Sequence, residues 1–436
     1  MIIQSLVLGS SFLLVSKNSH NSIFLNSNLS FVLFWSIFSI IKLLDNLFRA
    51  NNILLLLAYI CYIVYVLIEI DRIKLFILTF YSILYFLIGT YFNFQIRGGD
   101  SYLSTLGALS LSFPNEVNFD LSMFAHRPVL LSLIESLSLV INDNLFIFFF
   151  QFSSILLISF IIFVFYSQSK NLLLSGIFLL TIVTTPAVFL LSIYYEIHSY
   201  LALQLVTLTY IFIHEKNFFQ NQAIKDFMFS VIGFSVLLSR FEAILFFLPI
   251  LYIYNKKNKL DMKYRYLISS SAIWYISLYF LNYDYKSADK ILFLILGIGI
   301  LVSTLAINKI NFQLMSKSGL ILIFLNFILA AIDRKFYDSM LKLFNIITGN
   351  YAFWGTVGVI LFGLIIYQTI FSIKNDIFLI SIFPLWTINL LTIVGDVGTG
   401  WRYGLSSSIN RMLFSIFFLT LLNQILLWKN DKIFTN

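Results

Sequence analysis

Charged residues are scarce in this chain, and their scarcity argues against a soluble fold. They make up 11% of the 436 residues, whereas a soluble domain carries roughly 25%. Hydrophobic residues reach 60%, and they form continuous runs of membrane-spanning length rather than the alternating pattern of a β-barrel. The composition therefore predicts an all-α, polytopic membrane protein.

Cysteine and histidine are also rare, which limits the chemistry that the chain can perform. Cys61 is the only cysteine, so no disulfide can form within the chain. The four histidines show no metal-ligand spacing, and we expect neither a metal nor a cofactor. The net charge of +8 comes from Lys and Arg in short loops between apolar runs. Membrane topology explains that distribution, so we expect no nucleic-acid partner.

The apolar runs predict a transmembrane helical bundle of about 13–15 spans. Loops rich in Lys and Arg are placed in the cytoplasm, as the distribution of positive charge in membrane proteins indicates. The predicted apolar segments are 2–16, 30–44, 52–70, 73–92, 144–166, 171–191, 198–214, 227–255, 264–281, 291–307, 318–333, 351–371, 377–394 and 410–428. The loops predicted on the outer face are 93–143, 192–197, 282–290, 334–350 and 395–409.

Segment 227–255 has basic loops at both ends and carries Arg240 and Glu242 at its middle. A charge at the centre of one continuous span costs roughly 2.5–3.5 kcal/mol. Both observations predict a hairpin of two short spans whose tip, with Arg240, lies at the outer surface. Because the two charges are two residues apart, we expect them not to share a helix face. Arg240 either meets an anionic ligand or Asp100, or forms a structural ion pair.

Two features of loop 93–143 are suited to chemistry on a lipid phosphate. Asp100 follows Gly98 and Gly99, which allow close approach of the backbone to a ligand, although Gly-Gly-Asp is also ordinary turn chemistry. Arg127 precedes Pro128 and an apolar run, a pattern that predicts a helix start with an affinity for anions. The alternative for Arg127 is an interfacial helix whose arginine reaches lipid headgroups.

The remaining candidates lie in two other outer loops and at the start of the last span. Glu196 and His198 stand among tyrosines typical of an interfacial aromatic belt, and Glu196 is a candidate second acid. Trp401 and Arg402 lie in a glycine-rich segment, where they suit either sugar stacking beside a phosphate or a membrane-surface anchor. Arg411 stands deeper in apolar sequence, which favours a functional role.

In this order, the motifs resemble the glycosyltransferase C superfamily of polytopic enzymes that use polyprenyl-phosphate sugars. Gly99-Asp100-Ser101-Tyr102 is similar to the acidic motif of the family's first outer loop, and Arg127-Pro128-Val129 to its proline-led helix. Leu237 to Glu242 resembles the family's hairpin with an arginine at its tip. Ser101 stands where many members have a second acid, which argues against a metal site. The resemblance covers roughly residues 75–255 and, more loosely, the last span.

The resemblance implies a catalytic core at 73–255, preceded by a transmembrane extension at 1–72 and followed by transmembrane helices at 256–436. It implies a glycosyltransferase of the bacterial inner membrane whose site faces the periplasm. The donor would be a polyprenyl-phosphate-linked sugar and the acceptor a hydroxyl of a lipid or glycan. The resemblance also implies a role for each candidate residue: catalysis by Asp100 and Glu196, donor phosphate binding by Arg127, Arg240, Arg402 and Arg411, and sugar or acceptor binding by Tyr102, His126, His198 and Trp401.

Two other functions are compatible with the same residues. A polymerase that joins lipid-linked polysaccharide units would also need arginines on the outer face, but it need not depend on Asp100. A lipid or solute transporter would place its ionisable residues near the bilayer midplane, often in repeated halves. The sequence shows no such repeat, so the transporter ranks below the two enzymes.

Overall fold

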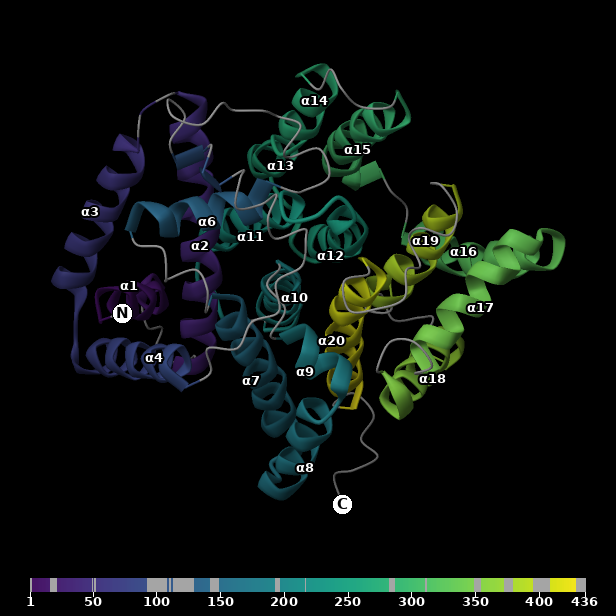
Figure 1. Cartoon of the computed structure of the whole chain (residues 1–436), viewed down its shortest axis with the longest axis horizontal. Coiled ribbons are helices and arrows are strands. Elements are labelled where there is room, and N and C mark those ends of the chain that lie inside the picture. The colour runs from purple at the N-terminus through teal and green to yellow at the C-terminus, as the bar shows by residue number, and fades with distance from the viewer. Residues whose placement is uncertain are drawn as a thin grey trace.

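The protein was analysed as a computed structural model, and its regular structure is helical throughout the part of the chain that it describes (Figure 1). The described residues are 2–15, 22–48, 50, 52–91, 108–109, 111–112, 129–141, 149–192, 197–215, 217–281, 287–309, 312–348, 354–371, 379–394 and 408–428. The first half contains α1 (Ile2–Ser10), η1 (Ser11–Leu13), α2 (Ile23–Leu47), α3 (Ile53–Glu69), α4 (Arg72–Tyr91), α6 (Val129–Ile141), α7 (Phe149–Ser169), α8 (Leu172–Val183), α9 (Pro186–Ser192), α10 (His198–Thr207) and η3 (Leu208–His214). The second half contains α11 (Gln222–Leu237), α12 (Ala243–Asn258), α13 (Met262–Ser269), α14 (Ala272–Leu281), α15 (Ser287–Leu305), η4 (Ile307–Lys309), α16 (Phe312–Ile332), α17 (Arg334–Thr348), α18 (Gly355–Phe371), α19 (Leu379–Val394) and α20 (Ser408–Trp428).

Three of the described helices are long and apolar enough to cross a membrane: Ile23–Leu47, Phe149–Ser169 and Asn410–Leu427. A fourth candidate is the pair α8 and α9, if the two helices are counted as one span. Four further apolar helices are shorter: Ile53–Glu69, Phe293–Leu305, Leu320–Ile332 and Gly355–Tyr367. The sequence-based prediction of an all-helical protein with membrane-spanning segments is therefore confirmed at this coarser level.

The apolar segment predicted at 171–191 is broken in the structure. α8 and α9 meet at an angle of 73°, and Pro186 occupies the first position of α9. Proline lacks the backbone N–H that a continuing helix needs and disfavours helical geometry in the preceding residue. The break therefore follows from the Thr185-Pro186 sequence, and the prediction of one continuous segment was wrong here.

The predicted hairpin at 227–255 is present. Helices α11 and α12 are joined by the turn from Leu238 to Glu242, and Arg240 stands at the centre of this turn. The helices extend a few residues beyond the apolar stretch, so each leg has 16 residues. At 1.5 Å per residue, each leg is about 24 Å long.

Side-chain pairs between the two legs show that they are antiparallel. Phe229 stacks on Tyr254 with ring centroids 3.8 Å apart. One turn closer to the start of α11, Lys225 Nζ donates a hydrogen bond to Asn258 Oδ1 at 3.0 Å. Residues nearer the start of α11 thus meet residues nearer the end of α12, as a hairpin requires.

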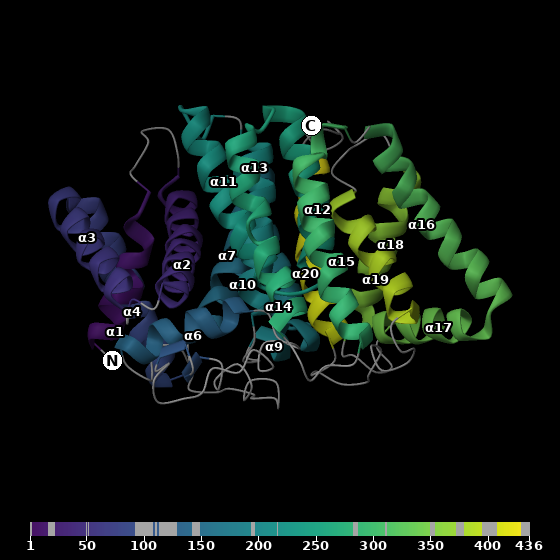
Figure 2. The same cartoon turned by 90° about the horizontal axis from the view of Figure 1, so that it is seen from above.

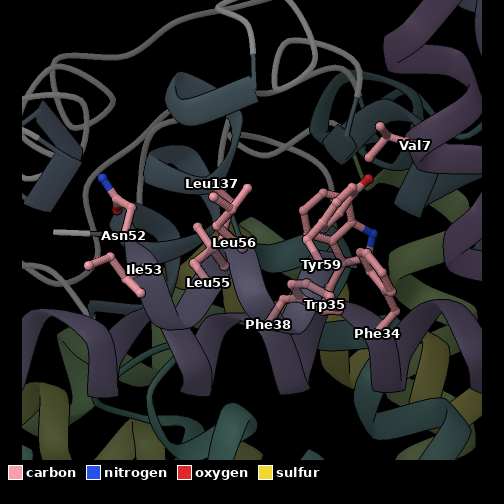
Figure 3. A pocket seen from close by; sticks show the side chains of 10 residues that line it. All are labelled: Val7, Phe34, Trp35, Phe38, Asn52, Ile53, Leu55, Leu56, Tyr59 and Leu137. Atoms are coloured by element: carbon pink, nitrogen blue, oxygen red, sulfur yellow. The ribbon is translucent and has the colours of Figure 1, made fainter. Parts of the chain in front are cut away.

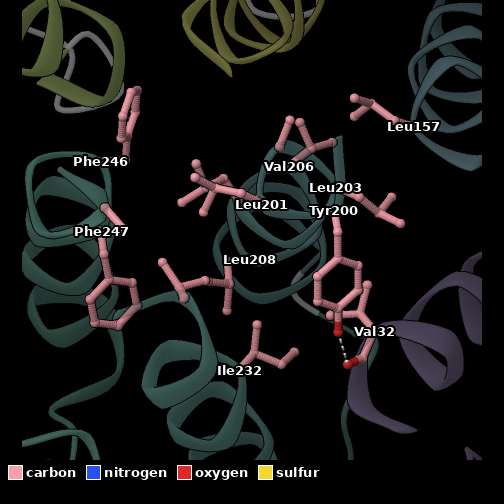
Figure 4. Packing of buried hydrophobic residues seen from close by; sticks show 14 of the residues in the cluster. Val32, Leu157, Tyr200, Leu201, Leu203, Val206, Leu208, Ile232, Phe246 and Phe247 are labelled. Carbon is pink, nitrogen blue, oxygen red and sulfur yellow. Dashed lines mark hydrogen bonds between the residues drawn. The ribbon is translucent and has the colours of Figure 1, made fainter. Parts of the chain in front are cut away.

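Helix α10 lies in the interior of the bundle and is held there by apolar packing and by polar contacts between helices. Its residues from His198 to Thr207 are all buried, and apolar side chains of neighbouring helices surround it (Figure 4). The Tyr200 hydroxyl donates to the Val32 carbonyl of α2 at 2.9 Å (Figure 4). Gln204 Nε2 donates to Ser235 Oγ of α11 at 2.9 Å. Hydrogen bonds of this kind stabilise helix association where apolar contacts alone give little specificity.

Helices α6, α9 and α17 lie toward the same edge of the molecule (Figure 2). The sequence predicted a loop at 334–350, but α17 occupies most of it. One side of α17 buries Leu343, Ile346 and Ile347, whereas Leu341 and Phe344 are exposed. A helix that also exposes large apolar side chains can lie along an interface instead of crossing it.

An apolar cavity of about 260 Å³ opens between the N-terminal helices and α6 (Figure 3). Trp35, Tyr59 and Leu137 contribute to its wall. Asn52 stands at its polar end, and its backbone N–H donates to Asp45 Oδ2 at 2.7 Å. Such a cavity suits a hydrocarbon chain better than a charged group, so it is not the candidate site for polar chemistry.

The close approach of the hairpin legs gives a first prediction. A Cβ at Gly233 would lie 2.4 Å from Phe247 Cζ, whereas a Cβ at Gly176 in α8 would meet nothing within 4 Å. Gly233→Leu should therefore lower thermal stability in detergent, by about 1–3 kcal/mol for overpacking. Gly176→Leu is the matched control and should be neutral or slightly stabilising, because leucine favours helix over glycine. Equal effects of the two substitutions would contradict the packing of this hairpin.

Candidate functional site

The structure describes three of the predicted site residues: His198, Arg240 and Arg411. The others lie outside the described residues, and their roles stay predictions: Asp100, Tyr102, His126, Arg127, Glu196, Trp401 and Arg402. The described part of the site therefore consists of these three residues and the helices that position them.

Arg240 forms an ion pair with Glu242 inside the hairpin turn. Arg240 Nε lies 2.5 Å from Glu242 Oε1, and the two side chains are 12% and 18% exposed. The helical rule predicts that residues two apart do not share a face and therefore do not pair. That expectation was wrong, because both residues lie in a turn, where the helical rule does not apply. The structure shows the ion pair that was one alternative for Arg240, and a contact of the same arginine with an anionic ligand stays a prediction.

Two other elements hold the hairpin turn in place. The Leu130 N–H, in the first turn of α6, donates to the Leu238 carbonyl at 3.1 Å. The Tyr275 hydroxyl of α14 donates to the Leu237 carbonyl at 2.5 Å. Both acceptors are carbonyl oxygens at the C-terminal end of α11, which have no partner within their own helix. The start of α6, the predicted helix after Arg127-Pro128, is thereby fixed beside the turn that carries Arg240.

His198 begins α10 and is completely buried. Its Nε2 lies 2.6 Å from the Leu191 carbonyl of α9, and its ring meets the Phe414 ring of α20 edge-on at 5.2 Å. Next to it, Ser199 Oγ accepts a hydrogen bond from Ser154 Oγ of α7 at 2.7 Å. His198 therefore joins three helices, and its predicted contact with a sugar stays a prediction.

Arg411 lies in the first turn of α20 and is only 3% exposed. The preceding Asn410 accepts a hydrogen bond from Trp354 Nε1 at 3.3 Å. Trp354 also packs against Phe417, about two turns further along α20, with ring centroids 5.5 Å apart. These contacts fix the start of α20 and with it the position of Arg411.

The described site residues belong to one electrostatic environment. The guanidinium groups of Arg411 and Arg240 both lie within electrostatic range of the His198 ring, although the three residues stand on separate elements. Two guanidinium groups in a largely buried setting favour an anionic partner, and their planar arrays of donors match the oxygens of phosphate or carboxylate. Glu242 supplies part of the compensating negative charge through its contact with Arg240.

The sequence-based analysis missed Glu135. This carboxylate lies in α6, the helix fixed beside the hairpin turn, and it is 5% exposed between the fully buried Ser132 and Ser136. The sequence does contain a signal, since Ser132, Glu135 and Ser136 follow helical spacing and share one side of the helix. A buried carboxylate is costly unless neighbouring groups compensate it, so Glu135 is a further candidate residue beside the hairpin turn.

Among the described residues, no group of three or more His, Cys, Asp and Glu side chains is arranged to hold a metal ion. Asp100 and Glu196 lie outside these residues, so the expectation of chemistry without a metal stays a prediction. Comparisons of the chain with protein-family models, with curated proteins and with solved structures found no match. The chemistry of the site must therefore be argued from its own residues.

The anchoring of the hairpin turn gives a second prediction. Tyr275→Phe should destabilise the protein by roughly 1 kcal/mol, because it leaves the buried Leu237 carbonyl without this donor. Tyr279→Phe, one helical turn further along α14, is the matched control, since the Tyr279 hydroxyl donates to no group that the structure describes. Thermal unfolding of both variants in the same detergent measures the difference. Equal stability would show that the Tyr275 hydroxyl does not anchor the turn.

Proposed function

We propose that this protein is a membrane-embedded glycosyltransferase that moves a sugar from a polyprenyl-phosphate carrier to an acceptor hydroxyl on the outer face. The observation that carries the proposal is the position of Arg240 and Arg411, which are distant in the sequence but both act on His198. The first turn of α6 is hydrogen-bonded to the turn that holds Arg240. The predicted phosphate ligand Arg127 precedes that helix by two residues in the sequence.

The proposed reaction assigns a separate task to each group. The acceptor oxygen attacks the anomeric carbon of the donor sugar, and the bond from that carbon to the phosphate oxygen breaks. Asp100 accepts the proton of the acceptor hydroxyl as general base. Arg127, Arg240 and Arg411, with Arg402, stabilise the negative charge that develops on the departing lipid phosphate. Glu196 positions the acceptor, and Tyr102, His126, His198 and Trp401 contact the sugar or the acceptor.

The proposal includes a polytopic bundle in the bacterial inner membrane, with the site facing the periplasm. The candidate spans and the four shorter apolar helices support it. Large apolar side chains are exposed along the helices at the periphery of the bundle, for example Leu56 of α3, Leu180 of α8 and Phe324 of α16. Apolar surface on this scale is expected where lipid surrounds the protein. The resemblance to the glycosyltransferase C superfamily agrees with this arrangement.

A transporter is the second candidate function, and one observation favours it. The bend of 73° between α8 and α9 is the kind of broken helix that transporters use to bind solutes. However, α9 contacts His198 through the Leu191 carbonyl, so the break lies next to the arginine-rich site. A polysaccharide polymerase would share that site, and it is distinguished by its independence of Asp100.

A third prediction concerns the general base. Asp100→Asn should reduce sugar transfer by about 10²–10⁴ and leave donor binding largely intact, because the amide has nearly the same size but cannot accept the proton. Asp120→Asn, in the same outer loop, is the matched control and should retain turnover. Both variants are measured in nanodiscs with polyprenyl-phosphate sugars as donors. Near-normal turnover of Asp100→Asn would refute the base role and favour a polymerase or a transporter.

The same assay separates the phosphate ligand from the base. Arg127→Ala should weaken donor binding as well as turnover, because a phosphate contact exists both before and during transfer. Arg97→Ala removes a basic residue of the same loop and should change neither quantity. Unchanged donor affinity in Arg127→Ala would assign that arginine to lipid headgroups at the membrane surface.

A further inference from the structure

A second cavity, which is polar, lies at the end of the hairpin opposite the Arg240 turn. It has a volume of about 510 Å³, and its wall includes Asn255, Lys256, Lys259, Asp261, Arg265 and Asn308. Since α12 has 16 residues, this cavity is separated from the Arg240 turn by about 24 Å of helix. It is therefore distinct from the site proposed for sugar transfer.

Arg265 is a buried cation whose hydrogen-bond acceptors are all neutral. It is 2% exposed. Its Nη2 donates to Asn255 Oδ1 at 2.9 Å and to Asn308 Oδ1 at 2.7 Å, and its Nε donates to the Leu260 carbonyl at 2.9 Å. Its Nη1 is also buried and has no hydrogen-bond partner among the residues that the structure describes. A buried guanidinium with a spare donor and no bonded carboxylate is costly unless an anion compensates it.

Asp261 does not fill that role. It acts electrostatically on Arg265, but its side chain is 69% exposed and pairs with Lys263 Nζ at 3.9 Å. Exposed pairs of this kind contribute little. The wall of the cavity therefore carries a net charge of +2, from three cations, Lys256, Lys259 and Arg265, and one anion, Asp261.

The backbone at Lys259, on the wall of the cavity, is left-handed. Lys259 has a φ of 54° and ends α12 in the left-handed conformation. Glycine is the usual residue at such a position, because a side chain there is strained. The preference for Lys and Arg in cytoplasmic loops does not explain the burial of Arg265.

We propose that this cavity binds a phosphate group, with Arg265 as the buried ligand and Lys256 and Lys259 at the rim. A guanidinium fork backed by ammonium groups matches the oxygens of a phosphate ester. The phosphate comes either from a small soluble molecule or from the headgroup of an anionic lipid. The positive-charge pattern of the loops places the cavity on the cytoplasmic side, so the site would be reached from the face opposite the sugar-transfer site.

The structure offers a closely matched pair of variants for the test. Lys170, between α7 and α8, also has a left-handed φ of 52°. In both lysines the backbone N–H donates to the carbonyl four residues earlier at 2.8 Å. Lys259→Gly and Lys170→Gly therefore remove the same charge and relieve the same strain, and both variants should fold at least as well as the wild type. Only Lys259 lies at the cavity.

Binding is measured on the full chain in a neutral detergent, with three probes. The probes are inorganic phosphate, dihexanoyl phosphatidylglycerol and the zwitterionic dihexanoyl phosphatidylcholine. We expect Lys259→Gly to weaken binding of inorganic phosphate or of phosphatidylglycerol roughly five- to tenfold, as for the loss of one charge-assisted contact. Lys170→Gly should bind as the wild type does, and phosphatidylcholine should bind weakly to all three proteins.

The outcomes separate the two sources of phosphate. Binding of inorganic phosphate that is sensitive to Lys259→Gly supports a site for soluble phosphate compounds. Binding of phosphatidylglycerol alone, with the same sensitivity, supports a lipid-headgroup site. If neither anion binds, or if Lys259→Gly and Lys170→Gly weaken binding equally, the proposal is overturned. None of these results depends on sugar transfer, so they leave the function proposed for the outer site unaffected.

Discussion

The fold depends on one constraint. Most of the chain is apolar, so each charged side chain must lie where it meets a polar partner or water. The hairpin of α11 and α12 shows how this is met. Arg240 and Glu242 interrupt a long apolar stretch, and the chain turns back at that point, so that the two charges pair with each other at 2.5 Å in the turn. In one continuous helix across a membrane the same residues would carry the full cost of isolated charges.

The hairpin also separates two kinds of polar environment. At its turn, hydrogen bonds from Leu130 and Tyr275 bring α6 and α14 against the same end of α11. Arg240 and Arg411 lie within electrostatic range of His198 there. At its open end, Lys225 and Asn258 close the legs, and Arg265 sits in a cavity with amide and carbonyl oxygens. Between the two ends, stacked rings such as Phe229 and Tyr254 join the legs. One supersecondary unit thus positions both proposed sites.

Features that follow from local sequence could be predicted. The hairpin and its turn at Arg240 followed from charge in an apolar stretch, and segment 198–214 matches α10 together with η3. Helix α6 was expected after Arg127-Pro128, and it begins at Val129. In each case, an apolar run bounded by charge or proline is enough to predict a helix, because the run is buried and its ends are polar or end the helix.

Features that depend on tertiary contacts could not be predicted in the same way. The pairing of Arg240 with Glu242 requires the turn geometry, and the burial of Glu135 requires the packing of α6. The sequence contains a signal for two other features. Pro186 indicates the break between α8 and α9, and the helical spacing of apolar residues indicates α17. Hydropathy alone does not detect either signal. Arg240, Arg411 and His198 stand on three elements that are far apart in the sequence. Their proximity depends on how these elements pack and could not be predicted from local sequence.

We propose that the turn of the hairpin and the chain beyond its open end lie on opposite sides of a membrane. Cys61 is the only cysteine, so a Cys61→Ser background allows single cysteines to be placed at Phe241, in the turn, and at Lys263, whose side chain is 66% exposed beyond the other end. Labelling of intact spheroplasts with a membrane-impermeant maleimide measures the location of each. We expect the cysteine at 241 to be labelled directly and the cysteine at 263 only after permeabilisation. Labelling of both positions from the same side would contradict it.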